Sequence, residues 1–203
     1  MSLRRGRVAR AGTVALRAHS GTGAESGAVA DGPDPDHAEL VVVVTPAEEP
    51  LAPALQRLAR QVLAAEGVRG PAELGLGFVT ESEMADLNRE WMGQDGATDV
   101  LAWPLDALSD GDADVDAEDD GPMPTVDMPR LLGDVVVCPA VAARQAETAG
   151  HDIADELALL VVHGVLHVLG HDHDGPEEEA VMQAREAAHL TRHHDPNWTR
   201  RSR

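Results

Sequence analysis

The sequence has 203 residues, 43% of them hydrophobic, which suffices for one domain with an apolar core. Its formal net charge of −20 argues against a uniformly basic surface of the kind that drives phosphate binding, although the charges are unevenly distributed. The single cysteine, Cys138, excludes an intramolecular disulfide and a cluster of thiolate ligands. This single cysteine is consistent with the reducing cytoplasm, where we expect the protein to act. No apolar run approaches the roughly 18 residues that span a bilayer, so we expect no membrane segment.

Residues 1–37 are rich in Gly, Ala, Ser, Asp and Pro and show no sustained hydrophobic period, so we expect a disordered N-terminal extension. One folded domain is predicted over residues 38–196, followed by a short tail over residues 197–203. Within the domain, residues 105–128 are predicted to be a disordered acidic insertion, because nine Asp or Glu and no basic residue lie between residues 106 and 127.

The rest of the domain predicts strands and helices in the order β, α, β, α, β, β, α, α, α. Apolar and β-branched runs predict the strands near residues 39–44, 72–79, 98–103 and 131–138. Helical spacing and end signals predict five helices. The first runs from Leu51 to a stop at Gly67, the second runs from the capping box Thr80–Glu83 to about Trp91, and the third begins at Pro139. The last two cover about residues 152–169 and 176–193. This order predicts an α+β fold, with a mixed sheet of about four strands packed against about five helices and with the two consecutive strands antiparallel.

The segment HGVLHVLGHDH, residues 163–173, places four histidines directly after the apolar run LALLVV. His163 and His167 are four residues apart on a predicted helix, so both imidazoles lie on one face and can reach one ion. Gly164, between them, leaves room for a close neighbour. The spacing therefore predicts a metal site rather than two unrelated core histidines.

Gly170 ends this helix and turns the chain, so a third ligand can return from the turn. His171 and His173 are both candidates for that ligand, with Asp172 and Asp174 beside them. Three imidazoles and one open position are typical of a catalytic zinc site, in which the ion polarises water or substrate. Ring nitrogens that do not face the metal need acceptors, and nearby carboxylates are expected to supply them.

The remaining histidines are expected to be solvated residues without a metal role. They are His19, His37, His151, His189, His193 and His194. Cys138 is expected to be a small buried strand residue. Zinc proteases of the H-E-x-x-H type carry a glutamate directly after the first histidine. Gly164 occupies that position here, which disfavours a standard peptidase of this type.

These motifs resemble the YbeY family, bacterial endoribonucleases that are also described as ribosomal RNA maturation factors. The resemblance covers roughly residues 39–195 and rests on three blocks. The first, HGVLHVLGHDH, is similar to the family pattern H-G-x-L-H-L-x-G-H/Y-D-H. The second, from Leu87 to Pro104, resembles L-N…T-D/N-V-L-S-F-P, and the third, LGDVVV at residues 132–137, resembles L-G-D-I.

The resemblance implies one zinc ion per chain, held by His163, His167 and His173, with His171 as a neighbour where the family accepts His or Tyr. It implies a mixed sheet with the zinc helix at its centre. It also implies RNA cleavage, maturation of the 3′ end of the small-subunit ribosomal RNA, and ribosome quality control. The expected partners are ribosomal RNA and the small ribosomal subunit, together with a basic ribosomal protein and an assembly GTPase.

The sequence departs from the family pattern beside the second block. Many members carry an arginine at the position of Met92, and a thioether cannot hold a phosphate. Arg89, one helical turn away, is the candidate substitute, although an exposed helix arginine without a role at the site is the favoured interpretation. Ala102 stands in place of the usual serine.

The nucleophile and the general base are left open by the residues. Asp172, Asp174 and Asp134 are candidates for the base, and either the RNA 2′-hydroxyl or water can attack. Two other functions fit the same histidines. One is a zinc hydrolase of another class, such as a peptidase or amidohydrolase, and the other is a non-catalytic ribosome assembly factor that contains zinc.

Overall fold

A computed structural model of the chain describes residues 40–45, 50–105, 129–171 and 175–198. Within these ranges the chain forms four strands: β1 (Leu40–Thr45), β2 (Ala72–Phe78), β3 (Val100–Pro104) and β4 (Arg130–Val137). The same described residues form six helical segments: α1 (Ala52–Ala65), α2 (Glu81–Leu87), the π-helix η2 (Asn88–Met92), α3 (Pro139–Ala149), α4 (Ile153–Val168) and α5 (Pro176–His193). The predicted α+β fold and the order of its elements are confirmed.

The four strands form one mixed sheet in the order β1-β2-β4-β3. β2 pairs in parallel with β1 on one side and with β4 on the other, whereas β3 pairs antiparallel with β4 at the edge. The antiparallel pairing predicted for the two consecutive strands is therefore confirmed. The predicted acidic insertion, residues 105–128, joins these two strands and, apart from its first residue, lies outside the described part of the chain.

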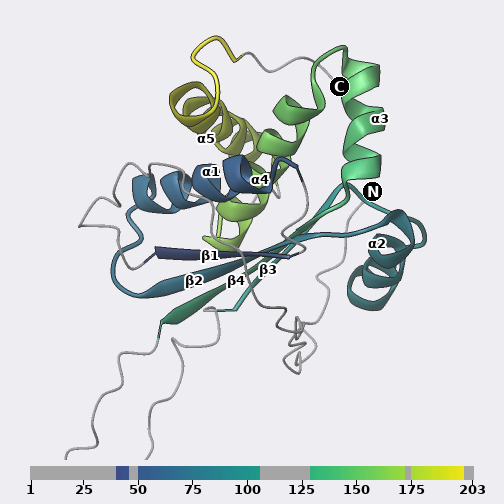
Figure 1. The fold of residues 1–203 in the computed structure, drawn as a ribbon, viewed down its shortest axis with the longest axis horizontal. Helices are drawn as coiled ribbons and strands as arrows, with labels where there is room; N and C mark the ends of the chain where they lie inside the picture. The colour runs from purple at the N-terminus through teal and green to yellow at the C-terminus, as the bar shows by residue number, and fades with distance from the viewer. Residues whose placement is uncertain (1–39, 46–49, 106–128, 172–174, 199–203) are drawn as a thin grey trace, which may run out of the picture. The chain divides into compact units, whose positions relative to one another are not determined.

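Buried and partly exposed residues alternate along β2, so the two faces of the sheet differ in burial. Ala72, Leu74, Leu76 and Phe78 are buried, while the residues between them are partly exposed. Side chains of a strand point alternately to opposite faces, so the buried set lies on one face, which helices α1 and α4 cover, while α5 packs against these two helices (Figure 1). On the other face, Val41 and Val43 of β1 remain 45% and 44% exposed.

Helix α4 occupies the centre of the core. All residues from Glu156 to Val162 are buried, and the helix contacts β3, β4, α1, α3 and α5. A helix that is apolar on nearly every side must be surrounded by protein. The two histidines predicted to bind metal thus lie on the most enclosed helix of the described chain.

A β-bulge in β4 sets the orientation of the strand beneath α4. In the pairing of β2 with β4, Glu73 is opposite Leu131 and Leu74 is opposite Gly133, so Leu132 is an extra residue. Gly133 has φ +148°, and a Cβ there would lie 2.2 Å from the carbonyl oxygen of Trp103. Only glycine fits this backbone contact, because an alanine Cβ would overlap main-chain atoms that cannot rotate away.

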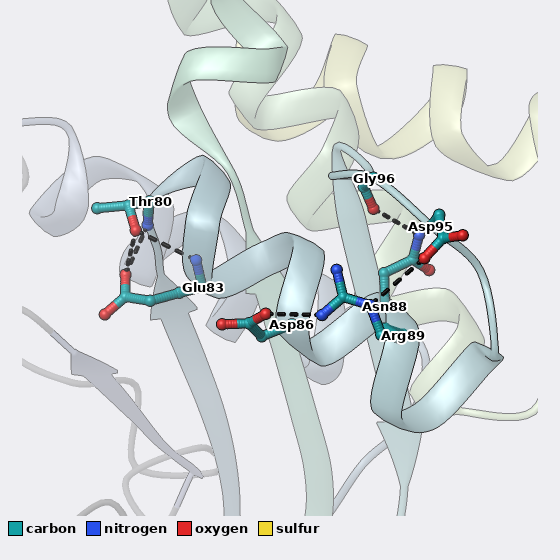
Figure 2. Close-up of polar contacts among 7 residues, drawn as sticks. All are labelled: Thr80, Glu83, Asp86, Asn88, Arg89, Asp95 and Gly96. Carbon is teal, nitrogen blue, oxygen red and sulfur yellow. Dashed lines mark hydrogen bonds and ion pairs between the residues drawn. The ribbon is translucent and has the colours of Figure 1, made fainter.

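The helix predicted to run from Thr80 to Trp91 divides into two parts. The predicted capping box is present, since the Thr80 hydroxyl oxygen accepts from Glu83 N at 3.3 Å and the Glu83 carboxylate accepts from Thr80 N at 2.8 Å (Figure 2). After Leu87 the helix widens into η2 and ends at Gly93, which adopts the left-handed conformation. Single π turns are rare and occur frequently at functional sites.

Cys138 is buried, as predicted, but it lies one residue beyond β4, at the N-cap of α3. The predicted extension over residues 1–37 lies outside the described residues, as does most of the tail over residues 197–203. The domain boundaries therefore stay predictions. None of the helices in the described ranges is long and apolar enough to cross a bilayer.

Candidate metal centre

His163 and His167 face each other on α4. Their Nε2 atoms are 3.1 Å apart, and their ring centroids are 4.5 Å apart with the ring planes inclined by 78°. Both residues are partly exposed although their helical neighbours are buried. The sequence spacing of four residues therefore brings two imidazole nitrogens to one accessible point on an otherwise enclosed helix, as predicted.

The far nitrogen of His163 is held by a buried carboxylate. Nδ1 of His163 lies 2.7 Å from Oε1 of Glu186, whose side chain is 1% exposed. An ionised carboxylate can only accept, so this contact makes Nδ1 the donor and leaves Nε2 with its lone pair toward His167. The carboxylate expected beside a metal-binding histidine is thus present, although it comes from α5, 23 residues further along the chain.

The two facing nitrogens fit a bound zinc ion. Nitrogen ligands of a tetrahedral zinc, each about 2.0–2.1 Å from the ion, stand about 3.3 Å apart, close to the 3.1 Å between the Nε2 atoms of His163 and His167. A histidine whose other nitrogen donates to a carboxylate is also the usual outer arrangement of such a site. The residues present therefore fit the metal that the sequence predicts.

Close packing fixes the height of α4 above the sheet. A Cβ added to Gly164 would lie 2.5 Å from Cγ1 and 3.1 Å from Cγ2 of Val135. Real Cβ atoms essentially never approach so closely, so the glycine is what allows α4 to rest on β4. The prediction that Gly164 accommodates a close neighbour is confirmed.

The turn after α4 leads toward the third predicted ligand. Gly170 adopts φ +86°, and the amide N–H groups of Gly170 and His171 donate to the carbonyl groups of His167 and Leu166 at 2.9 and 3.0 Å. Such paired bonds are typical of a helix that ends on a left-handed glycine. The chain therefore leaves the helix three residues after His167.

Residues 172–174, and with them the predicted ligand His173, the tentative catalytic residue Asp172 and Asp174, lie outside the described residues. Where the structure is described, no group of three or more His, Cys, Asp or Glu side chains could hold a metal ion. The described chain accordingly contributes two of the three predicted ligands.

His171 points to a second carboxylate instead. Its Nε2 lies 3.0 Å from Oε2 of Glu66, a residue just beyond the end of α1. Glu66 also accepts from Nε2 of His189 at 2.7 Å and from Nη1 of Arg185 at 2.8 Å. Partial burial raises the pKa of the Glu66 carboxyl, but the bonds from His189 and His171 and the charge of Arg185 outweigh burial and lower it. Glu66 is therefore an anionic acceptor.

Two histidines expected to be solvated bond to carboxylates instead. His189 is only 7% exposed and bonds to Glu66, while Nε2 of His151 lies 2.7 Å from Oε2 of the buried Glu156. The expectation of solvent exposure is wrong for His189, whereas His151 is partly exposed, with 12% of its side chain accessible. These rings can be withdrawn from solvent because Nε2 of each one bonds to a carboxylate. For His189 that partner is 123 residues away in the sequence, so local spacing could not reveal it.

A sequence profile of the family described as "Endoribonuclease YbeY" matches residues 44–194. The chain belongs to this family. The resemblance inferred from the three sequence blocks is thus confirmed. The predicted enzyme class, a hydrolase of RNA phosphodiester bonds, is confirmed at the level of the YbeY family.

Two curated relatives, both named endoribonuclease YbeY, illustrate the similarity. The protein of Salinispora tropica is 51% identical over 137 residues, which are 66% of this chain and 82% of the relative. The protein of Thermobifida fusca is 48% identical over 128 residues, which are 63% of this chain and 76% of the relative. The fold is also similar to the solution structure of a Thermotoga maritima protein, with a TM-score of 0.50 and 22% identity, covering 75% of this chain and 87% of that chain.

Arg89, the candidate substitute for the arginine of the YbeY pattern, is paired with two carboxylates. Its Nη1 lies 2.9 Å from Oδ1 of Asp86, and its Nε lies 3.3 Å from Oδ1 of Asp95 (Figure 2). These bonds, both at an exposed surface, raise the pKa of the Arg89 guanidinium. A phosphate would have to compete with both carboxylates for this side chain. Its catalytic role stays a prediction.

Met92 lies at the end of η2 and is 49% exposed. The adjacent Trp91 contacts Trp103 of β3 in an edge-to-face arrangement, with ring centroids 6.0 Å apart. Nδ2 of Asn88 donates to the carbonyl oxygen of Gly96 at 2.9 Å and closes the loop that follows (Figure 2). The segment that carries the departure from the YbeY pattern is thus well fixed, while the Met92 side chain itself is accessible.

Asp134 is not placed to act as a base at the paired histidines. Val135 contacts Gly164 of α4, and adjacent strand residues point to opposite faces, so Asp134 lies on the far side of the sheet. A Cβ on Gly75 would lie 2.0 Å from Oδ1 of Asp134, which shows that the carboxylate rests on the glycine backbone. Although Asp134 is exposed as a whole residue, this packing desolvates its carboxyl group and raises its pKa. The candidate base Asp134 therefore does not face the paired histidines.

Proposed function

We propose that this member of the YbeY family is a zinc-dependent endoribonuclease that cleaves single-stranded RNA and matures the 3′ end of the small-subunit ribosomal RNA. One observation carries the proposal: Nε2 of His163 and Nε2 of His167 are 3.1 Å apart, and Nδ1 of His163 is held by the buried Glu186. This is the arrangement of a metal ligand pair with its outer carboxylate. The names of the relatives, endoribonuclease YbeY, support the reaction.

Each residue has a distinct task in this proposal. His163, His167 and His173 would hold one zinc ion per chain. Zinc, when bound, would supply Lewis acidity at the phosphodiester group. Glu186 would hold the proton of His163 on Nδ1, so that Nε2 is the atom that binds the metal, and Asp172 is the candidate that accepts the proton of the attacking hydroxyl group.

The proposed partners follow from the proposed substrate. The enzyme would act on the small ribosomal subunit in the cytoplasm, during ribosome maturation and quality control, beside a basic ribosomal protein and an assembly GTPase. The acidic stretch over residues 106–127 has the charge that suits a basic protein rather than RNA.

A cleavage assay tests the function. The purified protein, with its zinc content measured in parallel, is incubated with a precursor that contains the 3′ end of the small-subunit ribosomal RNA. We expect about one zinc per chain and cleavage that stops on chelation and returns when zinc is added. Zinc binding without cleavage, on free RNA and on small subunits alike, would favour the non-catalytic assembly factor instead.

End-group analysis of the same products identifies the nucleophile. A 2′,3′-cyclic phosphate shows that the neighbouring 2′-hydroxyl attacked, whereas a linear phosphate from the first turnover shows that water attacked. Turnover of peptides or amides that disappears on chelation would point to the zinc hydrolase of another class.

The departure at Met92 leads to a gain-of-function prediction. Met92→Arg is expected to tighten RNA binding, because it restores a cation at a 49% exposed position. For one added contact to single-stranded phosphate, the slope of log affinity against log salt should steepen by about 0.7. Ile153→Arg, at a 39% exposed position at the start of α4, is the control with the same charge. An equal effect of both variants would assign the gain to net charge alone.

A further inference from the structure

Arg185 of α5 lies close to His171, the residue that follows the glycine stop of α4. Its Nη1 lies 2.8 Å from Oε2 of Glu66, and Nε2 of His171 lies 3.0 Å from the same oxygen. The two nitrogens share one acceptor at these distances and are therefore at most about 5.8 Å apart. The backbone N–H of His171 donates to the carbonyl oxygen of Leu166. Arg185 thus brings a cation to the end of the helix that carries the paired imidazoles.

The residue after Arg185 touches the paired imidazoles directly. Glu186 is buried, and its Oε1 lies 2.7 Å from Nδ1 of His163. Consecutive helix residues diverge by about 100° around the axis, so Glu186 points into the protein while Arg185, 44% exposed, lies beside it at the surface. One turn of α5 therefore supplies both the outer carboxylate of the candidate metal centre and a neighbouring cation.

Arg185 keeps most of its hydrogen-bonding capacity for a ligand. A guanidinium has five N–H donors, and within the described residues Arg185 makes one bond, from Nη1 to Glu66. Glu66 also accepts from His171 and His189, so its negative charge is shared among three donors. Arg89, in contrast, bonds to two separate carboxylates. A half-exposed guanidinium held through one nitrogen suits a phosphate, which it can bind with two parallel bonds.

We propose that Arg185 binds a phosphate group of the RNA strand beside the candidate metal centre, with Glu66 holding the guanidinium in place. This inference rests on the proposed function, because it takes RNA as the substrate. It assigns to α5 a phosphate contact of a kind that the thioether of Met92 cannot make. The local sequence does not mark this arginine, since its anchor Glu66 is 119 residues away.

The test is the affinity of Arg185→Gln for a fluorescently labelled single-stranded oligoribonucleotide, measured by anisotropy over a series of salt concentrations. We expect binding about 10-fold weaker than wild type, as for the loss of a charged hydrogen bond. The slope of log affinity against log salt should become shallower by about 0.7. Arg192→Gln is the matched control, because it removes the same charge from the same helix about 10 Å further along. It should change both quantities far less.

Glu66→Gln separates a direct phosphate contact from an indirect effect. The amide keeps the size of the side chain but loses its charge, so a folded Glu66→Gln protein should bind the oligoribonucleotide at least as tightly as wild type. If Arg185 acted only by holding Glu66, both variants would weaken RNA binding alike, which would overturn the inference.

Two further outcomes separate this inference from the function on which it rests. Wild-type RNA affinity in Arg185→Gln, or equal losses in Arg185→Gln and Arg192→Gln, would overturn the phosphate contact and leave the proposed function standing. A wild-type protein that binds no RNA, or that cleaves none, would overturn the proposed function itself. The two failures are therefore distinguishable.

Discussion

His167→Ala is expected to abolish stable zinc binding and to reduce RNA cleavage to the background. The substitution removes one of two nitrogens that stand 3.1 Å apart and leaves His163 with no partner on its helix for sharing an ion. The loss of zinc affinity should exceed the 10–100-fold that the loss of an outer partner costs. Zinc content after dialysis against a weak chelator and cleavage of the ribosomal RNA precursor measure the two effects.

His194→Ala provides the control for this prediction. His194 is an exposed histidine that bonds to Asp155, and its removal should leave both zinc content and cleavage unchanged. Circular dichroism should show that His167→Ala keeps its helices, because the imidazole is partly exposed and is not part of the apolar core. Full cleavage by a metal-free, folded His167→Ala protein would refute the metal-dependent mechanism.

Gly164→Ala is expected to destabilise the protein by about 2 kcal/mol, because an extra methyl group forced into a packed core costs about 1–3 kcal/mol and the overlap here places the cost at the upper end. In an isolated helix, replacing glycine by alanine stabilises by about 1 kcal/mol. Here the new Cβ would lie 2.5 Å from Cγ1 of Val135, so the overlap outweighs the gain in helix propensity. Urea denaturation of the metal-free protein gives the change in the free energy of unfolding.

The double variant Gly164→Ala, Val135→Ala identifies the cause. Val135→Ala alone should destabilise the protein through a cavity, but in the double variant the new methyl group fills part of that space. The double variant should therefore be more stable than the sum of the two single effects predicts. Strict additivity would show that the contact between α4 and β4 is not the origin of the destabilisation.

The secondary structure could be predicted because its signals are local. The capping box at Thr80 and the apolar run of α4 appear in the structure where the residues place them. Helix capping and hydrophobic periodicity depend on neighbours within four residues. The π-helical end of α2 was not predicted, because it has no distinctive local pattern.

In the candidate metal centre, only the part that depends on local spacing could be predicted. His163 and His167 are four residues apart on one helix, so their facing arrangement follows from helix geometry alone. Their partners do not follow in this way. Glu186, which contacts His163, comes from α5, and Glu66, which contacts His171, lies just beyond the end of α1. Nothing in their local sequence marks them as different from solvated glutamates. Their roles depend on which helix faces pack together, and this is a property of the tertiary structure.

Asp134 and Val135 show most directly what the tertiary structure decides. In LGDVVV, either residue could face α4, because strand alternation allows two registers. The bulge at Leu132 inserts one residue and reverses the orientation of every residue after it, so Val135 meets Gly164 and Asp134 points away. By itself the sequence determined the elements, the family and the facing pair of histidines that is predicted to bind metal. The tertiary structure decided which carboxylates serve them, since burial and strand register depend on contacts between distant segments.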